Sequence, residues 1–368
     1  MSLLVLDPDI AGQESLGNQL LKQLTELDFH TIDTTDARAT TDLALQGSVE
    51  LVACCCACST DLPDIPATIP RVWVVGETPS ADDLLTALRG DVCDVWQLPI
   101  DSDELSQRVA DIRQRMNERS NVMQAEMSEM RLELERDQRA GQYIQMGMLP
   151  PNPMDIGHYR LQHKLKPSLL LSGDFVDYFQ ISDRYFACYV ADVAGHGASS
   201  AFVTVLLKNF SRRLRREYRV SMLSNPGEVL AWINTELIDQ GLDKHVAMFF
   251  GIFDTQSELL HYANAAHLPP ASLVLDGKVT SLEQRAKPLG LFPDLAYQSL
   301  TVEFPKGAKL VVFSDGVFDL IDQPTLAEKE ALLADAIIAT DNMDELWSNF
   351  KQDLQIPDDV SCLMVQYA

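Results

Sequence analysis

Residues 103–148 are almost free of glycine and proline, and the stretch ends at a cluster of prolines. Its apolar side chains recur every seven residues, at Val109, Met116, Met123 and Met130. This is the spacing of a helix that packs along one seam. The proline-rich residues 149–153 then end the helix, because proline lacks an N–H donor and disfavours the helical conformation before it. The pattern predicts one long helix between two folded regions.

The seam of this helix is imperfect. Arg119 and Glu126 stand where a second apolar residue is expected, so a coiled coil built on it would be short or interrupted. We expect the linker, residues 104–148, to pair weakly with that of a second copy and so form a homodimer. The alternative is a single amphipathic helix packed against its own domains.

Short apolar runs alternate with stretches of helical periodicity in residues 1–103. The runs lie at residues 3–6, 51–58, 72–75 and 92–96. This alternation is typical of parallel strands joined by crossover helices. We therefore expect a doubly wound, flavodoxin-like α/β domain here.

A second domain, of α+β type, is expected from residue 149 to residue 368. Its strand-like runs lie at residues 169–171, 185–191, 248–253, 272–275, 309–313 and 360–366. Its helical stretches lie at residues 199–218, 226–241 and 326–340.

The composition excludes some classes of partner. The formal net charge of -25 repels nucleic-acid phosphates and anionic lipid. One basic run, residues 212–219, lies in an apolar helical pattern and is better explained as a solvated helix face than as an anion site. No targeting signal or apolar run of about 18 residues occurs, so we expect a cytoplasmic protein without nucleic-acid or membrane partners.

The cysteines indicate a reducing compartment. Four of them, Cys54, Cys55, Cys56 and Cys58, share one strand-like run. Consecutive side chains of a strand point to opposite faces, which suits neither a disulfide nor a tetrahedral zinc site. The other three stand alone in apolar surroundings, as buried thiols do.

Four acidic segments are candidates for chemistry in the second domain. Their aspartates are Asp174 and Asp177, Asp192, Asp315, and Asp358 and Asp359. Each segment lies beside a glycine or at the end of an apolar run, where carboxylates can converge at the rim of a sheet and bind hard divalent cations. Taken singly, an Asp-Gly pair is more simply a turn.

In order and context these segments resemble the PPM phosphatases, the PP2C-like enzymes of the SpoIIE and RsbU type. That family carries Gly-Asp-x-x-Asp, Asp-Val-x-Gly-His-Gly, Asn-Ala-Gly-His-x-Pro, Asp-Gly and Asp-Asp motifs in that order. All five occur here, at residues 173–177, 192–197, 264–269, 315–316 and 358–359, with Ala266 in place of a usual glycine. The resemblance implies an αββα sandwich and metal-dependent hydrolysis of protein phosphoserine or phosphothreonine.

The resemblance also implies a role for each matching residue. The implied metal ligands, the first four of them catalytic, are Asp174, Asp192, Asp315, Asp358, the Val193 carbonyl and Asp359. Asp192 would bridge two Mg²⁺ or Mn²⁺ ions, which would acidify a water for in-line attack on phosphorus without a cysteine nucleophile. Asp359 fits better behind the ligands than on an ion. Supporting roles fall to Asp177, Gly195, His196, Gly197, Asn264, His267 and Gly316.

His196 is a candidate general acid towards the leaving serine oxygen. In the animal-type phosphatases, however, the acid histidine directly precedes the glycine that matches Gly195, and Ala194 has that place here. We therefore interpret His196 and His267 as structural residues of their turns, with a water protonating the leaving group.

The first hundred residues resemble the receiver domains of response regulators. Asp7 and Asp9 match the acidic pair of a receiver, but the phosphoacceptor position falls on Cys55 and the usual lysine on Leu98. We therefore expect a degenerate receiver without a phosphoacceptor. Asp61 could serve only if the third strand ran several residues longer.

The whole layout resembles the RssB-type response regulators of pseudomonads, which regulate the general-stress sigma factor. This implies a phosphatase of an anti-sigma-factor antagonist or a related phosphoprotein, controlled through the receiver-like domain and the linker. The alternative is a non-catalytic adaptor that binds a sigma factor or its regulators. The intact acidic set favours catalysis.

Overall fold

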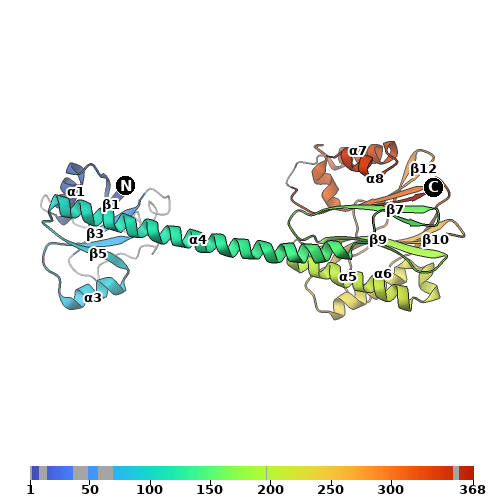
Figure 1. Ribbon diagram of the computed structural model, residues 1–368, viewed down its shortest axis with the longest axis horizontal. Helices are drawn as coiled ribbons and strands as arrows, with labels where there is room; N and C mark the ends of the chain where they lie inside the picture. Colours follow the sequence, from blue (N-terminus) through green and yellow to red (C-terminus); the bar gives the residue numbers. More distant parts are fainter. Residues whose placement is uncertain (1, 8–14, 36–48, 57–68, 196, 351–355) are drawn as a thin grey trace. The chain divides into compact units, whose positions relative to one another are not determined.

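The computed structural model describes residues 2–7, 15–35, 49–56, 69–195, 197–350 and 356–368. The chain divides into two compact units, Met1–Met130 and Arg131–Ala368, and the helix α4 (Ser102–Met148) continues across their boundary (Figure 1). Four residues named above lie outside the described ranges: Asp9, Cys58, Asp61 and His196. Within those ranges, no helix has the length and apolar character needed to cross a membrane.

The first unit contains a five-stranded parallel sheet with two described helices. Its strands and helices are β1 (Ser2–Leu6), α1 (Leu16–Glu26), β2 (His30–Thr34), β3 (Leu51–Cys55), β4 (Arg71–Val75), α3 (Ala81–Arg89) and β5 (Val92–Gln97). The strand order is β2-β1-β3-β4-β5. The parallel strands expected of an α/β domain are therefore present. The strand β2 was missed because its sequence, His-Thr-Ile-Asp-Thr, contains no apolar run.

The long helix expected over residues 103–148 is confirmed as α4. Leu105, Val109 and Ile112 of α4 are buried in the core of the first unit. Farther along, the apolar side chains of Val122, Met123, Met127, Met130, Leu132 and Leu134 are exposed. Apolar side chains of this kind on a solvated helix are suited to contact another protein surface.

The second unit consists of two antiparallel sheets and four α-helices within the described ranges. The strands are β6 (Met154–Ile156), β7 (Tyr159–Lys166), β8 (Asp174–Gln180), β9 (Tyr185–Val193), β10 (Val246–Asp254), β11 (Leu259–Ala265), β12 (Ala271–Leu275), β13 (Lys278–Leu282), β14 (Leu300–Glu303), β15 (Lys309–Phe313) and β16 (Val360–Tyr367). The helices are α5 (Ala198–Glu217), α6 (Pro226–Asp239), α7 (Leu326–Ala339) and α8 (Met343–Ser348).

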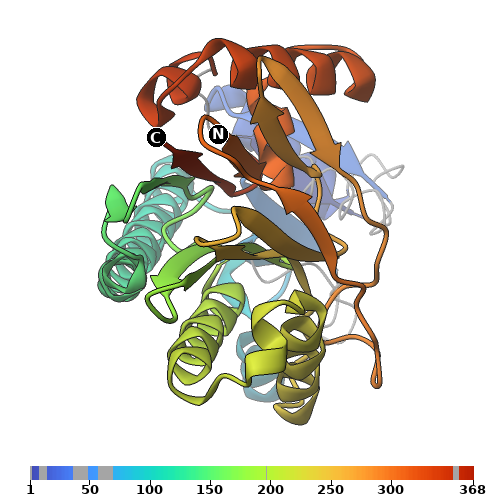
Figure 2. The same cartoon turned by 90° about the vertical axis from the view of Figure 1, so that its right-hand side faces the viewer.

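The two sheets lie face to face between two layers of helices (Figure 2). One sheet has the order β14-β11-β10-β9-β8, and the other has the order β13-β12-β15-β16-β7-β6. A core rich in aromatic side chains fills the space between the sheets, with Phe186, Phe253 and Phe304 fully buried. The outer face of the first sheet is covered by α5 and α6, and that of the second by α7 and α8.

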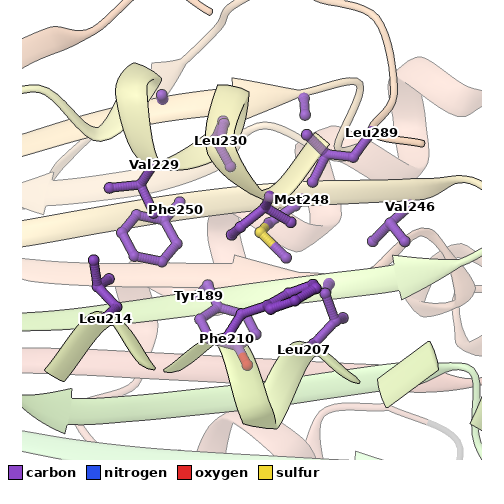
Figure 3. Packing of buried hydrophobic residues seen from close by; sticks show 14 of the residues in the cluster. Tyr189, Leu207, Phe210, Leu214, Val229, Leu230, Val246, Met248, Phe250 and Leu289 are labelled. Carbon is purple, nitrogen blue, oxygen red and sulfur yellow. The ribbon is translucent and has the colours of Figure 1, made fainter. Parts of the chain in front are cut away.

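Apolar side chains of α5 and α6 pack on the first sheet around Tyr189 and Phe250 (Figure 3). Leu207 and Phe210 come from α5, and Leu230 comes from α6. The three helices predicted in this unit are confirmed as α5, α6 and α7, with bounds that differ by at most two residues.

The strand predicted at residues 169–171 is wrong, because these residues form bends before β8. The strands β6, β7, β8, β11, β13 and β14 were not predicted. The sequence of β7, Tyr-Arg-Leu-Gln-His-Lys-Leu-Lys, alternates polar with apolar residues, as strands with one solvated face do. β8 contains two acidic residues, which conceal its burial in the sequence.

Candidate active site

Two of the predicted metal ligands lie opposite each other on neighbouring strands. Asp174 begins β8, Asp192 is the last residue but one of β9, and the two are direct partners in the antiparallel pairing. Such partners have Cβ atoms about 4.5–5.5 Å apart, and like charges there repel. Both aspartates thus lie inside strands, whereas the sequence had suggested positions just past strand ends.

The other two predicted ligands come from the second sheet. Asp315 follows β15 and opens the 3-10 helix η3 (Asp315–Leu320), and Asp358 lies just before β16. Because β15 and β16 are neighbours, with Phe313 opposite Cys362, these two aspartates lie at the same end of the pair. Each sheet therefore contributes two carboxylates to one acidic cluster.

The cluster is closed on one side and open on the other. Asp174 is 2% exposed and Asp192 is partly buried, whereas Asp315 and Asp358 are exposed. Burial and the charge of Asp192 raise the pKa of Asp174 well above its ordinary value. Burial raises the pKa of Asp192 to about 7, with further contributions from the charges of Asp315, Asp358 and Asp359.

The donor chemistry and the charge of the cluster fit a hard divalent cation. Carboxylate and carbonyl oxygens are the ligands that Mg²⁺ and Mn²⁺ prefer, and Mg²⁺ usually keeps several waters. In the described part of the chain, none of the four carboxylates forms an ion pair with a basic side chain. Among those same residues, no three His, Cys, Asp or Glu side chains are gathered closely enough to hold an ion as they stand. A bound cation would offset both the burial and the neighbouring negative charges that raise the pKa of Asp192.

Hydrogen bonds tie the segment before Asp174 to the second sheet. Ser314 Oγ donates to Asp174 Oδ2 at 2.5 Å, and the Gly173 N–H donates to Asp359 Oδ2 at 2.6 Å. Asp359 Oδ1 accepts from Ser168 N at 2.6 Å and from Ser168 Oγ at 2.9 Å. The carboxylate of Asp359, a residue that is 2% exposed, therefore holds the backbone that positions Asp174.

Two glycines allow close backbone approach beside the cluster, one within each sheet. A Cβ on Gly316 would lie 2.1 Å from the carbonyl oxygen of Asp359, and one on Gly173 would lie 2.9 Å from that of Val193. Both contacts are with backbone, so a side chain at either position would displace a segment that carries a candidate ligand. The structure thus gives a steric reason for the supporting role predicted for Gly316.

Gly195 and Gly197 adopt backbone conformations that other residues rarely take. Their φ angles are +83° and +82°, in the region that favours glycine. Gly197 is the N-cap of α5. The two glycines therefore turn the chain sharply from β9, which carries Asp192, into α5.

Asp177 lies behind the cluster in an ion pair. Lys208 of α5 donates to its Oδ1 at 2.8 Å, and the Asp177 side chain is 1% exposed. Burial raises the pKa of Asp177, and the Lys208 charge opposes this increase. The structure thus places Asp177 between β8 and α5, and no sequence pattern indicated Lys208 as its partner.

Asn264 and His267 form a turn at the end of β11. The Asn264 side chain accepts from the His267 N–H at 2.7 Å and donates to the His267 carbonyl at 3.1 Å. Ala266 has a φ of +57°, which explains why glycine is usual at this motif position. His267 is 1% exposed, and burial lowers its pKa to about 4, so its ring is neutral at physiological pH.

Gln145, near the end of α4, makes buried hydrogen bonds that were not predicted from the sequence. Its Nε2 donates to the Ser172 carbonyl at 2.7 Å and to Thr204 Oγ1 at 3.0 Å, and its Oε1 accepts from the Ser172 N–H at 3.1 Å. Gln145 is 2% exposed. One side chain thus connects the linker helix to the segment before Asp174 and to α5. A glutamine in a polar helix gives no sequence signal of such burial.

Two of the residues matched to a receiver site, Asp7 and Cys55, lie at the ends of the neighbouring strands β1 and β3. Asp7, 3% exposed, accepts from the Gly17 N–H at 2.7 Å. Cys55 is the last residue of β3, and burial, with a contribution from the charge of Asp7, raises the pKa of its thiol. A thiol held protonated is a poor nucleophile, and Leu98 is buried and apolar.

A profile of the SpoIIE family, described as Stage II sporulation protein E, matches residues 182–368, just over half of the 368 residues. The chain therefore belongs to the SpoIIE family. The phosphoserine phosphatase RsbP of Bacillus subtilis is 29% identical over 155 residues, which cover 40% of this chain and 37% of RsbP. The phosphoserine phosphatase RsbU of the same organism is 24% identical over 215 residues, which cover 54% of this chain and 61% of RsbU.

These matches span less than two thirds of the length of either relative. Among solved structures, the SiaA-PP2C domain of Pseudomonas aeruginosa matches with a TM-score of 0.54 at 17% identity, covering 65% of this chain and 98% of that domain. This similarity confirms the expected PP2C-like fold of the second unit.

Proposed function

We propose that this chain is a metal-dependent protein phosphatase that removes phosphate from phosphoserine or phosphothreonine. The observation that carries the proposal is the pairing of Asp174 with Asp192 across β8 and β9, beside Asp315 and Asp358 from the other sheet. Two relatives named as phosphoserine phosphatases support this activity.

Two Mg²⁺ or Mn²⁺ ions per phosphatase domain, when bound, would activate a water and neutralise phosphoryl charge. Asp174, Asp192, Asp315, Asp358 and the Val193 carbonyl would hold them. Asp315 and Asp358 lie on the exposed side of the cluster, where a phosphorylated side chain can enter. Ser314 and Asp359 would keep Asp174 in place through the bonds described above.

The cysteines of the second unit do not suit nucleophilic attack. Cys188 and Cys362 are fully buried, and burial raises the pKa of both thiols. The thiolate is the reactive form of cysteine, so attack by water is the chemistry that this site supports.

Hydrolysis of p-nitrophenyl phosphate by the full chain tests the proposed activity. We expect hydrolysis with Mn²⁺, its loss when EDTA is added in excess and its return when Mn²⁺ is restored. Hydrolysis that continues unchanged in EDTA would contradict a metal-dependent mechanism.

We further propose that α4 controls the site and that the first unit is a degenerate receiver acting through it. The strand order β2-β1-β3-β4-β5 is that of flavodoxin-like folds, which supports the receiver-like assignment. Gln145 supports control by α4, because it bonds the end of this helix to Ser172, two residues before Asp174. An anti-sigma-factor antagonist or a related phosphoprotein is the proposed substrate.

Replacing Gln145 with alanine should lower activity at least about tenfold. The change leaves the buried N–H and carbonyl of Ser172 without this partner, and each such loss costs about 1–3 kcal/mol. Initial rates at several Mn²⁺ concentrations measure the effect. Gln124→Ala, at an exposed position of the same helix, is the matched control. Equal activity of the two variants would contradict the proposal that Gln145 links α4 to the activity of the site.

We also propose a homodimer through α4. Met123 and Met130, which lie on the predicted seam, are exposed. Replacing both with lysine should convert a dimer into a monomer in sedimentation velocity experiments, because charge in a seam opposes helix pairing. Gln124→Lys should leave the dimer intact. A wild-type chain that sediments as a monomer at high concentration would contradict the proposal.

A further inference from the structure

Ala194, in the loop after Asp192, is held by the two residues that precede β10. Lys244 Nζ donates to the Ala194 carbonyl oxygen at 2.9 Å, and the Ala194 N–H donates to the His245 carbonyl oxygen at 2.9 Å. Ser200 Oγ also donates to the Ala194 carbonyl, at 3.2 Å, and accepts from Lys244 at 3.3 Å. Neither the motifs nor the proposed chemistry assigns a role to Lys244.

The bond to His245 fixes the direction of a candidate metal ligand. The N–H and the C=O of a trans peptide point in opposite directions. Because the Ala194 N–H points to His245, the Val193 carbonyl points away from it. Consistent with this direction, the Val193 oxygen lies 2.9 Å from the place that a Cβ on Gly173 would take. This carbonyl is therefore directed to the segment that carries Asp174.

The bond from Lys244 fixes the next peptide. Since the Ala194 carbonyl points to Lys244, the N–H of Gly195 points the opposite way. Gly195 is exposed, and within the described ranges no hydrogen-bond acceptor for its N–H is found. A backbone N–H that is fixed in direction and open to solvent can donate to an anionic oxygen.

We propose that Lys244 is a positioning residue of the phosphatase site. It holds the Ala194–Gly195 peptide directly, so that the Gly195 N–H faces a phosphoryl oxygen of the substrate. By fixing Ala194 it also supports the neighbouring Val193–Ala194 peptide, which the bond to His245 orients and whose carbonyl would face a bound cation. Lys244 itself does not touch the reacting atoms. This inference rests on the proposed function, since it names what orients the same site.

The proposal predicts an effect on cation binding opposite in sign to the effect of charge. A lysine near a cation site repels the cation, so removing its charge would by itself strengthen Mn²⁺ binding. Loosening of Ala194, and through it of the adjoining Val193 carbonyl, would weaken binding. The sign of the change therefore distinguishes positioning from simple electrostatics.

The test is Mn²⁺ titration calorimetry on full-length Lys244→Met, whose side chain keeps its length but has no donor. We expect the dissociation constant for Mn²⁺ to rise roughly tenfold, as loss of a hydrogen bond from a charged group predicts. The KM for p-nitrophenyl phosphate should also rise, because the Gly195 N–H is no longer fixed. Lys244→Arg keeps a donor and should recover most of the affinity. Lys306→Met, at an exposed position between β14 and β15, should behave as wild type.

Unchanged or tighter Mn²⁺ binding by a Lys244→Met chain that melts at the wild-type temperature would overturn the proposal. If that variant does not fold, Ser200→Ala removes the second donor to the Ala194 carbonyl and should weaken Mn²⁺ binding about threefold. Unchanged binding by Ser200→Ala would then overturn it. A wild-type chain that binds no Mn²⁺ overturns the proposed function as well, whereas normal binding by wild type and Lys244→Met alike overturns this inference alone.

Discussion

Asp192→Asn is expected to lower Mn²⁺-dependent phosphate release roughly 10²–10³-fold, the range found when one preorganised charge-stabilising group is removed from an active site. The change keeps the shape of the side chain but removes a negative charge that would help to hold the cations. Phosphate release at saturating Mn²⁺ measures the effect. Asp155→Asn, at an exposed position of β6, is the matched control and should remain active.

The same substitution should stabilise the metal-free protein. Asp192 lies opposite Asp174, and the folded state raises the pKa of Asp192 to about 7. A carboxyl with a raised folded-state pKa reduces stability as pH rises above its unfolded pKa, and the full cost is present above the folded pKa. At pH 8 in EDTA, Asp192→Asn should therefore melt at a higher temperature than wild type. A lower melting temperature would contradict the view that the ionised, partly buried Asp192 carboxylate destabilises the metal-free fold.

The adaptor alternative predicts a different result from Asp192→Asn. If the chain were an adaptor whose metal site no longer functions, a partner protein would bind the variant and the wild type equally. Neither chain would then release phosphate. Loss of phosphate release in the variant alone supports catalysis.

Asp359→Asn is expected to lower both stability and activity. Both carboxylate oxygens accept from backbone N–H groups, one from Gly173 and one from Ser168. Whichever way an asparagine is placed, its NH₂ group faces one of these donors. A buried donor left without an acceptor costs about 1–3 kcal/mol, and the Asp174 segment loses its support. We expect a lower melting temperature and activity reduced at least about tenfold.

Its neighbour Asp358 provides the matched comparison. Asp358 is exposed, and its Oδ1 accepts from the Asp359 N–H at 2.8 Å, a bond that an asparagine oxygen can keep. Asp358→Asn should therefore weaken Mn²⁺ binding and leave the melting temperature unchanged. Equal thermal stability of the two variants would contradict the assignment of Asp359 as the support of the Asp174 segment.

Local patterns predicted much of the fold. The run Leu310–Phe313 is continuously apolar and lies between the polar residues Lys309 and Ser314, and the strand predicted at residues 309–313 forms β15 with those bounds. The strand β8 was missed because its first and fourth residues are the aspartates of the site. Burial of Asp174 in β8 is set by its neighbours in space, Asp192 and Ser314, which a local pattern does not contain.

The sequence predicts which aspartates belong to the candidate site, but not the hydrogen bonds that hold the surrounding segments in place. Spacing and order brought Asp174, Asp192, Asp315 and Asp358 into one hypothesis, since each motif is local. Gln145 and Lys244 could not be found in this way, because their partners Ser172 and Ala194 are 27 and 50 residues away along the chain. Such contacts depend on how helices and strands pack, which a single sequence does not display.

The most direct test of the account is phosphate release from a phosphoserine peptide as Mn²⁺ is titrated. The measurement uses the full chain and the compact unit of residues 131–368, so that control by the first unit is separated from catalysis. We predict release that depends on Mn²⁺, is absent in EDTA and is lost in Asp192→Asn. No release by either wild-type chain at any Mn²⁺ concentration, or equal release by Asp192→Asn, would contradict the assignment of the acidic cluster as a phosphatase site.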